Sequence, residues 1–336
     1  MNHPGTVRVA AIDCGTNSLR LLIADVDAEA GRLTDVDRRM EIVRLGQGVD
    51  ATGRLGAEPL ARTFRALERY AAAIRDARAV AVRMVATSAT RDAENAGEFI
   101  AGVIAILGLA PEVLTGDEEA FLSFTGATAE LGPAAEPAEA AGQAPGGGQP
   151  AWPVPAEPPY LVVDIGGGST EFVCGSGQPA AALSVDIGCV RLTERYLHGD
   201  PPEAGEIAAA TAAIDAALDT VAEKVPVATA RTLVGLAGSV TTVTGIALGM
   251  SRYDAARIHH ARIPAGRVHQ VTSELLGQTR QQRARIGVMH PGRADVIAAG
   301  ALVLDRVLVR FGFAEVMASE HDILDGIAWS LVTGGR

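Results

Sequence analysis

Short apolar runs along the chain alternate with longer stretches in which apolar residues recur at helical spacing. In the first part of the chain the runs predict strands at 7–12, 19–26, 34–43, 79–86 and 112–114. The helical spacing predicts helices at 60–78, 95–107 and 117–130. The predicted order is therefore three strands followed by helix, strand, helix, strand and helix.

The same order returns after residue 159. The pattern predicts strands at 160–164, 171–174, 181–185, 231–236 and 315–318. It predicts helices at 205–224, from the Gly238-Ser239 turn through 248, at 264–278, at 293–311 and from 322 onward. The chain thus contains two copies of one α/β unit, and two such lobes would enclose a cleft between their first hairpins.

One segment differs in composition from both copies. Residues 132–159 are nearly all Ala, Pro, Gly, Glu and Gln, and such a segment cannot bury enough apolar area to offset the entropy of ordering it. We predict a disordered loop there. The predicted lobes are 1–125, with a C-terminal helix of about 319–336 packed back on it, and 126–318, which contains the loop.

Composition narrows the function. The 336 residues carry a net charge of −11, which disfavours non-specific nucleic-acid binding, and a polyanionic substrate would need a local basic channel. The three cysteines fit no metal motif or disulfide framework and suit a reducing cytoplasm. No apolar run reaches the ~20 residues of a membrane span, and no signal peptide is expected. We therefore predict a cytoplasmic protein without a membrane partner.

Each copy begins with a strand that ends in an acid and a glycine-containing turn. The first copy reads AIDCGTNS and the second reads LVVDIGGGSTE, so Asp13 and Asp164 occupy equivalent positions in the two copies. Glycine turns present backbone N–H groups to phosphate oxygens, and an Asp can hold Mg²⁺ through water. One such turn alone is often only a tight hairpin, but two matching turns favour phosphate binding. The predicted phosphate ligands here are Gly15, Thr16, Asn17, Ser18, Gly166, Gly167, Gly168, Ser169 and Thr170.

A third glycine turn, Gly238-Ser239, precedes a helix, where free N–H groups and the helix dipole favour anions. Close packing of a small-residue helix explains it equally well. Three acids, Asp117, Glu118 and Glu119, begin another predicted helix. Acids are ordinary dipole partners there, but one that faces the cleft would serve as a general base, and the sequence does not choose among them.

Other charged residues are less informative. Arg20 and Arg91 follow the first turn and a hydroxyl-rich strand end, and either would suit a phosphate, although a single Arg is more often a solvated surface residue. His259, His260, His290 and His321 show no zinc-type spacing, and we predict that they are structural or surface residues.

With these motifs, the chain resembles the exopolyphosphatase / guanosine pentaphosphate phosphatase (Ppx/GppA) family in its short, two-domain form. The matching stretches extend in family order from residue 10 to about 327, and DIGGGSTE together with G-x-E-E-A is the most specific part. The resemblance implies two actin-like (ribonuclease H-like) lobes with an interdomain cleft. It also implies the absence of the further C-terminal domains that longer members use to hold long polyphosphate.

The resemblance also implies residue roles. Glu119 takes the catalytic-base position, and Glu171 is similar to the family's water-organising acid. Asp13 and Asp164 are the expected Mg²⁺ positions, with Mn²⁺ as a substitute and a monovalent cation as a further option. Arg91 matches a phosphate-binding arginine, and the glycine turns with Gly238 and Ser239 complete the predicted phosphate site.

The expected function is hydrolysis of terminal phosphoanhydride bonds of inorganic polyphosphate, which releases orthophosphate. One alternative is a 5′-phosphohydrolase of guanosine pentaphosphate (pppGpp), since the motifs do not separate the two activities. Alternatives of other classes are an actin-like ATP-binding chaperone or scaffold and an inactive polyphosphate sensor. The expected partners are polyphosphate, (p)ppGpp and a second copy in a homodimer, without nucleic acid.

Overall fold

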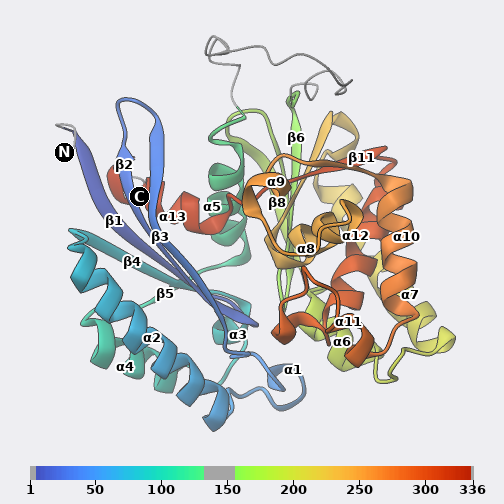
Figure 1. Ribbon diagram of the computed structural model, residues 1–336, viewed down its shortest axis with the longest axis horizontal. Helices are drawn as coiled ribbons and strands as arrows, with labels where there is room; N and C mark the ends of the chain where they lie inside the picture. The colour runs from blue at the N-terminus through green and yellow to red at the C-terminus, as the bar shows by residue number, and fades with distance from the viewer. Residues whose placement is uncertain (1–4, 132–155, 334–336) are drawn as a thin grey trace.

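The computed structural model describes residues 5–131 and 156–333 and contains two sheets in separate lobes (Figure 1). The first sheet has the order β3-β2-β1-β4-β5. Its first three strands are antiparallel neighbours, while β4 and β5 run parallel to β1. The strands are β1 (Thr6–Cys14), β2 (Ser18–Asp27), β3 (Arg32–Ile42), β4 (Ala81–Ala86) and β5 (Glu112–Val113).

The second sheet repeats this arrangement and adds one strand. Its order is β10-β11-β9-β6-β7-β8, in which β6, β7 and β8 are antiparallel and β9 and β11 are parallel to β6. The extra edge strand, β10, was not predicted. The two-copy prediction is therefore confirmed at the level of topology. The strands are β6 (Tyr160–Ile165), β7 (Thr170–Gly175), β8 (Pro179–Val185), β9 (Thr232–Leu236), β10 (Arg262–Pro264) and β11 (Glu315–Ala318).

Every predicted helix is present. The helix predicted at 293–311 begins later, at Ile297, because residues 291–293 form a 3-10 turn that starts with a proline. Those predicted are α2 (Ala57–Ala77), α4 (Ala96–Leu107), α5 (Gly116–Thr128), α7 (Ala204–Lys224), α8 (Ala237–Ala247), α10 (Ala265–Leu276), α12 (Ile297–Phe311) and α13 (Ile323–Thr333). The prediction missed α1 (Val49–Thr52), α3 (Ser88–Arg91), α6 (Cys189–Tyr196), α9 (Ala255–Ile258) and α11 (Arg280–Arg283).

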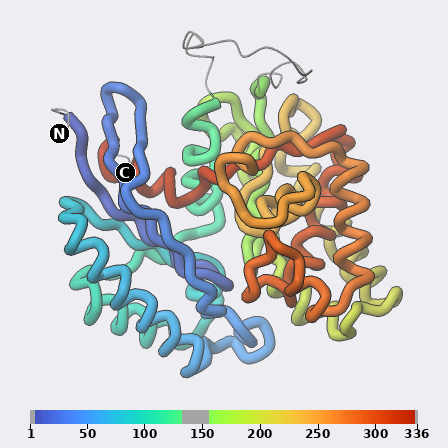
Figure 2. The backbone as a smooth tube through the Cα atoms, in the orientation of Figure 1, coloured from blue at the N-terminus to red at the C-terminus, as the bar shows by residue number. Residues whose placement is uncertain are grey.

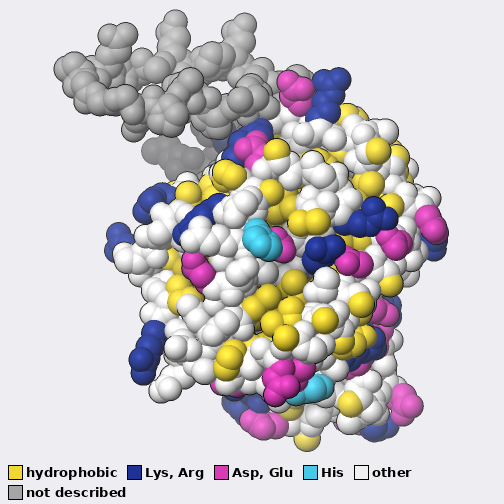
Figure 3. All heavy atoms as spheres, turned by 90° about the vertical axis from the view of Figure 1, so that its right-hand side faces the viewer, with side chains coloured by type: hydrophobic (Ala, Val, Ile, Leu, Met, Phe, Trp, Pro, Cys, Tyr) yellow, Lys and Arg dark blue, Asp and Glu magenta, His cyan; other side chains and the backbone are white. Residues whose placement is uncertain are grey.

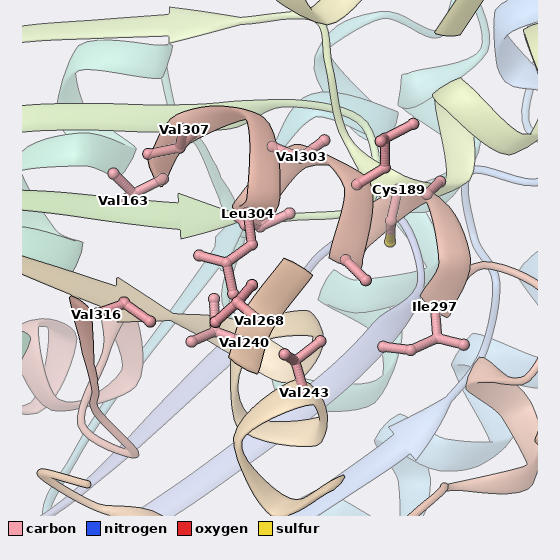
Figure 4. Close-up of a cluster of buried hydrophobic side chains, with 14 of the residues drawn as sticks. Val163, Cys189, Val240, Val243, Val268, Ile297, Val303, Leu304, Val307 and Val316 are labelled. Atoms are coloured by element: carbon pink, nitrogen blue, oxygen red, sulfur yellow. The ribbon is translucent and has the colours of Figure 1, made fainter. Parts of the chain in front are cut away.

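Each sheet has its own apolar core. Helices α2 and α4 cover one face of the first sheet, with Leu21, Leu67 and Phe99 fully buried between them. In the second lobe, Val303, Leu304 and Val307 of α12 contact a cluster that includes Val163 and Val240 (Figure 4). These contacts fix the ends of β1 and β6, which carry the two glycine turns.

The C-terminal helix α13 returns to the first sheet (Figure 2). Its Ile323 and Ile327 share a core with Val9 and Leu22 on the face opposite α2. Helix α5 crosses α13 so closely that a Cβ added at Gly126 would lie 1.8 Å from a backbone oxygen of the segment before α13. Helix α5 also packs on the second sheet, so the predicted lobe limit at 125/126 falls within one helix.

Most of the loop predicted at 132–159 lies outside the described residues. Its last four residues are described and are bonded to the second lobe. The backbone N–H of Glu157 donates to Thr232 Oγ1 at 3.0 Å, and Thr232 Oγ1 donates to the Glu157 carbonyl at 3.0 Å. The prediction of disorder is therefore wrong for residues 156–159, because these bonds attach the segment to the start of β9.

The surface shown in Figure 3 carries basic and acidic side chains interspersed with apolar ones rather than a patch of one charge. Among the described helices, none combines the length and the apolar character that crossing a bilayer requires.

Candidate active site

A cleft lies between the first hairpins of the two lobes and has a volume of about 80 Å³, enough for several water molecules. It is lined by the two glycine turns, the end of β4, the start of α5 and the start of α8. Four predicted site residues, Arg91, Gly168, Thr170 and Glu171, are not among its lining residues. The predicted residues that line it are Asp13, Gly15, Thr16, Asn17, Ser18, Glu119, Asp164, Gly166, Gly167, Ser169, Gly238 and Ser239.

The two turns touch each other at Gly168. A Cβ at this position would lie 2.6 Å from Ser88 Oγ and 2.9 Å from Thr16 Oγ1. These two hydroxyls share a buried hydrogen bond of 2.9 Å. Glycine at 168 is therefore required by the close approach of the lobes.

The second turn is oriented by α6. The backbone N–H groups of Cys189 and Val190 donate to the carbonyls of Gly166 and Gly167 at 2.9 Å. These two carbonyls of the turn are thus bonded to α6. In the described parts of the chain, no acceptor bonds the backbone N–H groups of four cleft residues, which are Thr16, Asn17, Gly167 and Ser169. Backbone donors of this kind form anion sites.

The structure distinguishes among the three acids at the start of α5. Glu118 belongs to a capping box, because its side chain accepts the N–H of Thr115 at 2.8 Å. Asp117 and Glu118 are exposed, whereas Glu119 is 9% exposed and lines the cleft. Of the three, only Glu119 is placed to act on a molecule in the cleft.

The Glu119 carboxylate has an unusual environment. Its Oε2 is buried and accepts no hydrogen bond from the described residues, and Arg91 Nη1 lies 3.6 Å away. Burial raises the pKa of Glu119 well above its usual value, and the neighbouring Glu171 and Asp13 add to the shift. A carboxylate with a raised pKa and an oxygen that accepts no hydrogen bond suits a general base.

Arg91 lies behind this acid. It donates from Nη1 to the Leu114 carbonyl at 2.7 Å and is adjacent to Glu119. This position fits a residue that holds Glu119, and its predicted contact with phosphate stays a prediction.

In the first hairpin, Asp13 pairs directly across the strands with Arg20. Arg20 donates to Asp13 Oδ2 from Nη2 at 2.7 Å and from Nε at 2.9 Å, and its Nη1 donates to Asp322. Burial raises the pKa of Asp13, although Arg20 opposes the shift. The second oxygen, Asp13 Oδ1, is buried and has no hydrogen-bond partner in the described residues.

In the second hairpin, Asp164 pairs across the strands with Glu171. Ser123 Oγ donates to Asp164 at 2.8 Å, and Ser184 Oγ donates to Glu171 at 2.7 Å. Burial, followed by the nearby Asp322, raises the pKa of Asp164 to about 6. Burial and Asp164 raise the pKa of Glu171 to about 7. Both acids therefore titrate close to neutral pH.

The residues present fit a Mg²⁺ ion held largely through water. Asp13 Oδ1 is a buried carboxylate oxygen without a hydrogen-bond partner in the described residues, and such hard oxygens are the ligands that Mg²⁺ prefers. No three carboxylates of the cleft, as far as the chain is described, bring ligand atoms within 4.8 Å of one another. This spacing fits an ion that keeps several of its waters and bridges to phosphate.

The chain matches known proteins over most of its length. The model of the Ppx/GppA phosphatase family matches residues 22–138 and 151–333. Exopolyphosphatase 2 of Mycobacterium tuberculosis is 50% identical over 335 residues, which cover 96% of this chain and 98% of that protein. The chain belongs to the Ppx/GppA phosphatase family.

Solved structures agree with this assignment. A crystal structure of an exopolyphosphatase-like protein shares 39% identity at a TM-score of 0.86, over 98% of this chain and 99% of the other. The Ppx/GppA family member of Aquifex aeolicus shares 30% identity at a TM-score of 0.78, over 98% and 99%. The predicted family and the two-lobed actin-like fold are thus confirmed, and the family favours a phosphatase over a chaperone or scaffold.

The Ppx/GppA cleft opens beside a larger cavity of about 450 Å³. Arg20, Gly238 and Arg293 line both spaces. The larger cavity is also lined by Arg38 and Arg39, which pair with Asp325 and Asp37, and by the acids Glu320 and Asp322.

Sequence reasoning missed Arg293, Thr87 and Ser88, all of which line the cleft. The Arg293 guanidinium lies against the third glycine turn, where a Cβ at Gly238 would be 2.1 Å from its Cζ. It makes one long hydrogen bond, 3.5 Å to the Gly238 carbonyl, and no ion pair with the described carboxylates. Burial lowers the pKa of Arg293. No local motif marks it, whereas the hydroxyl-rich ATSAT stretch does mark Thr87 and Ser88.

Proposed function

We propose that the protein is an exopolyphosphatase, which hydrolyses the terminal phosphoanhydride bond of inorganic polyphosphate and releases orthophosphate. The observation that carries the proposal is a buried Glu119 oxygen that accepts no hydrogen bond from the described residues, in a cleft where backbone N–H groups of both lobes have no acceptor. The family and the name of the mycobacterial relative support it.

The terminal phosphate would be held by the glycine turns. Backbone N–H groups of Thr16, Asn17, Gly167 and Ser169 supply fixed donors for its oxygens, and Arg293 supplies a charge that no described carboxylate neutralises. Fixed donors stabilise the transition state of phosphoryl transfer because they need no reorganisation when charge develops.

Glu119 would then act on water. A water oxygen attacks the terminal phosphorus in line, its proton passes to Glu119 Oε2, and the bond from phosphorus to the bridging oxygen breaks. The shortened chain leaves with the electrons of that bond. The raised pKa of Glu119 makes it a stronger base than an ordinary carboxylate, and Arg91 at 3.6 Å keeps the side chain in place.

Asp13 and Asp164 would hold the metal ion through water, with Mg²⁺ as the first choice and Mn²⁺ as a substitute. When bound, the ion supplies positive charge that neutralises phosphate oxygens. The chain's own contribution is to keep these acids ionised, through Arg20 at Asp13 and through the Ser123 hydroxyl at Asp164.

The remainder of the polyphosphate chain would lie in the larger cavity. Arg20 and Arg293 connect this cavity to the cleft, and Arg38 and Arg39 lie farther along. These four arginines would supply the local positive charge that a polyanionic chain needs. Arg20, Arg38 and Arg39 are each paired with aspartates, whereas Arg293 forms no ion pair with the described carboxylates.

The same cavity supports pppGpp as a second candidate substrate. Its volume of about 450 Å³ and its lining by Met40, Tyr253 and Met289 give a nucleoside both space and apolar surface.

The deciding experiment measures orthophosphate release with Mg²⁺ from short polyphosphate, long polyphosphate, pppGpp and ATP. We expect release from polyphosphate that far exceeds release from pppGpp. Release chiefly from pppGpp would favour the second candidate and assign the larger cavity to the nucleoside. Tight ATP binding without release from any substrate would refute both proposals.

A further inference from the structure

Three segments that are distant in sequence bring a glutamate and histidines together outside the cleft. Glu130 follows α5, His259 follows α9, and His321 lies on the segment that crosses from β11 to α13 (Figure 1). His259 Nε2 is 3.3 Å and His321 Nδ1 is 3.5 Å from Glu130 Oε2. Ligand atoms of all three residues lie within 4.8 Å of one another.

These separations match those between neighbouring ligands of one metal ion, and the 3.3 Å contact of His259 Nε2 with Glu130 Oε2 is also within hydrogen-bond distance. Zn²⁺ binds imidazole nitrogen and carboxylate oxygen at about 2.0–2.1 Å, so neighbouring ligands of a tetrahedral site lie roughly 3.3–3.4 Å apart. A charge-assisted hydrogen bond would be shorter, about 2.7–2.9 Å. Two imidazoles with one carboxylate are also a ligand set that suits Zn²⁺ and related transition metals.

The neighbouring His260 holds the site in shape. Its ring stacks on His259 with 3.7 Å between centroids. Its backbone has φ of 61°, a left-handed conformation that is unfavourable for a non-glycine residue. The His260 N–H donates to the Ala318 carbonyl at 2.7 Å, which fixes this conformation. Strain that the surroundings maintain is common at ligand sites.

We propose that Glu130, His259 and His321 bind a divalent transition-metal ion of the Zn²⁺ type. The side chains are 49%, 21% and 25% exposed, so an ion can enter from solvent. The fourth position is open to water. The site joins the end of α5, the second lobe and the C-terminal crossover, and it does not depend on the polyphosphatase proposal.

Ion binding would also affect the crossover segment. His259 Nδ1 accepts the N–H of Glu320 at 3.2 Å, so the proton of the neutral ring is on Nε2. When Nε2 binds an ion, the ring proton is on Nδ1, so Nδ1 can no longer accept the N–H of Glu320. Glu320 lines the larger cavity, two residues before Asp322, which pairs with Arg20.

The test measures Zn²⁺ binding by calorimetry to the untagged protein in excess Mg²⁺, which occupies the hard-oxygen sites. The variants are His259→Ala, His321→Ala and Glu130→Gln. The matched control is His269→Ala, which also removes a histidine beside a carboxylate, Asp305 at 3.2 Å. Far-UV circular dichroism and thermal unfolding in Mg²⁺ alone verify that each variant is folded.

We expect one site in the wild type that His269→Ala retains. The His259 and His321 variants should each lose affinity by more than the roughly 10–100-fold typical of losing an outer-shell partner. The exposed Glu130→Gln change should weaken binding without affecting folding. Equal affinities in all variants, or no Zn²⁺ binding to the wild type at micromolar concentration, would overturn the proposal.

Discussion

The two hairpins that face each other across the cleft share a topology but differ in one cross-strand pair. In the first lobe the acid at the strand end, Asp13, is opposite an arginine, Arg20. In the second lobe the equivalent acid, Asp164, is opposite another acid, Glu171. One hairpin is therefore neutralised within itself, and the other retains negative charge.

This difference in the cross-strand residue gives the two hairpins different electrostatic roles in the site. A buried acid that is paired with arginine stays ionised and fixed, which suits anchoring of a cation or of the substrate chain. Burial and Asp322 raise the pKa of Asp164 to about 6, and burial and Asp164 raise the pKa of Glu171 to about 7, so this hairpin is sensitive to pH and to cations. We infer that the repeat provided two similar phosphate turns, and that the cross-strand residue gave each turn its own electrostatic role.

The largest effect is expected at Glu119, which lies between the two hairpins. Glu119→Gln should lower kcat on polyphosphate by roughly 10²–10⁴-fold, the usual contribution of a general base. The matched control is Glu118→Gln, which keeps the capping box because Gln also caps. Near-normal turnover in a folded Glu119→Gln protein would refute the assignment.

A second change makes the first hairpin resemble the second. Arg20→Met would leave Asp13 and Asp322 buried without their shared partner. We expect a loss of roughly 3–5 kcal/mol in the free energy of unfolding, as for other broken buried ion pairs. Urea unfolding measures it. The double variant Arg20→Met/Asp322→Asn should recover part of the loss, and strict additivity would argue against the pairing.

A third change makes the second hairpin less acidic. The folded pKa of Glu171 is raised from 4.5 to about 7, so its contribution to stability is present below pH 4.5 and is lost as the pH rises through 7. Glu171→Gln removes this loss, which is roughly 3 kcal/mol at 1.36 kcal/mol for each pKa unit. Without Mg²⁺, the variant should gain stability over the wild type from pH 5 to pH 8. A constant difference across this range would contradict the assigned pKa.

The smallest effect compares glycines in the two turns. Gly168→Ala meets Ser88 Oγ at 2.6 Å and should cost about 1–3 kcal/mol, because the two lobes must separate slightly. Gly15→Ala in the first hairpin meets nothing closer than 3.6 Å and should change stability by less than about 0.5 kcal/mol. Thermal unfolding of the two variants tests whether the close approach of the lobes makes glycine necessary at 168 but not at 15.

The sequence was sufficient for the repeat, the long helices and the two turns, because each depends on local periodicity or on adjacent residues. It was not sufficient to choose Glu119 among three neighbouring acids. That choice depends on two features of the folded chain. The side chain of Glu118 is bonded to Thr115 in the capping box of α5, and the orientation of α5 brings Glu119 to the cleft. Arg293 and the Glu130–His259–His321 group were also beyond local patterns, since their partners lie far away in the chain.

The return of α13 to the first sheet has a consequence for biosynthesis. Val9 and Leu22 share their core with Ile323 and Ile327, which are synthesised long after them. The face of the first sheet that α13 covers therefore stays open until α13 itself has been synthesised. Contacts of such large sequence separation close slowly, and exposed apolar surface attracts chaperones in the meantime. The N-terminal lobe, although made first, is expected to be the last to complete its folding.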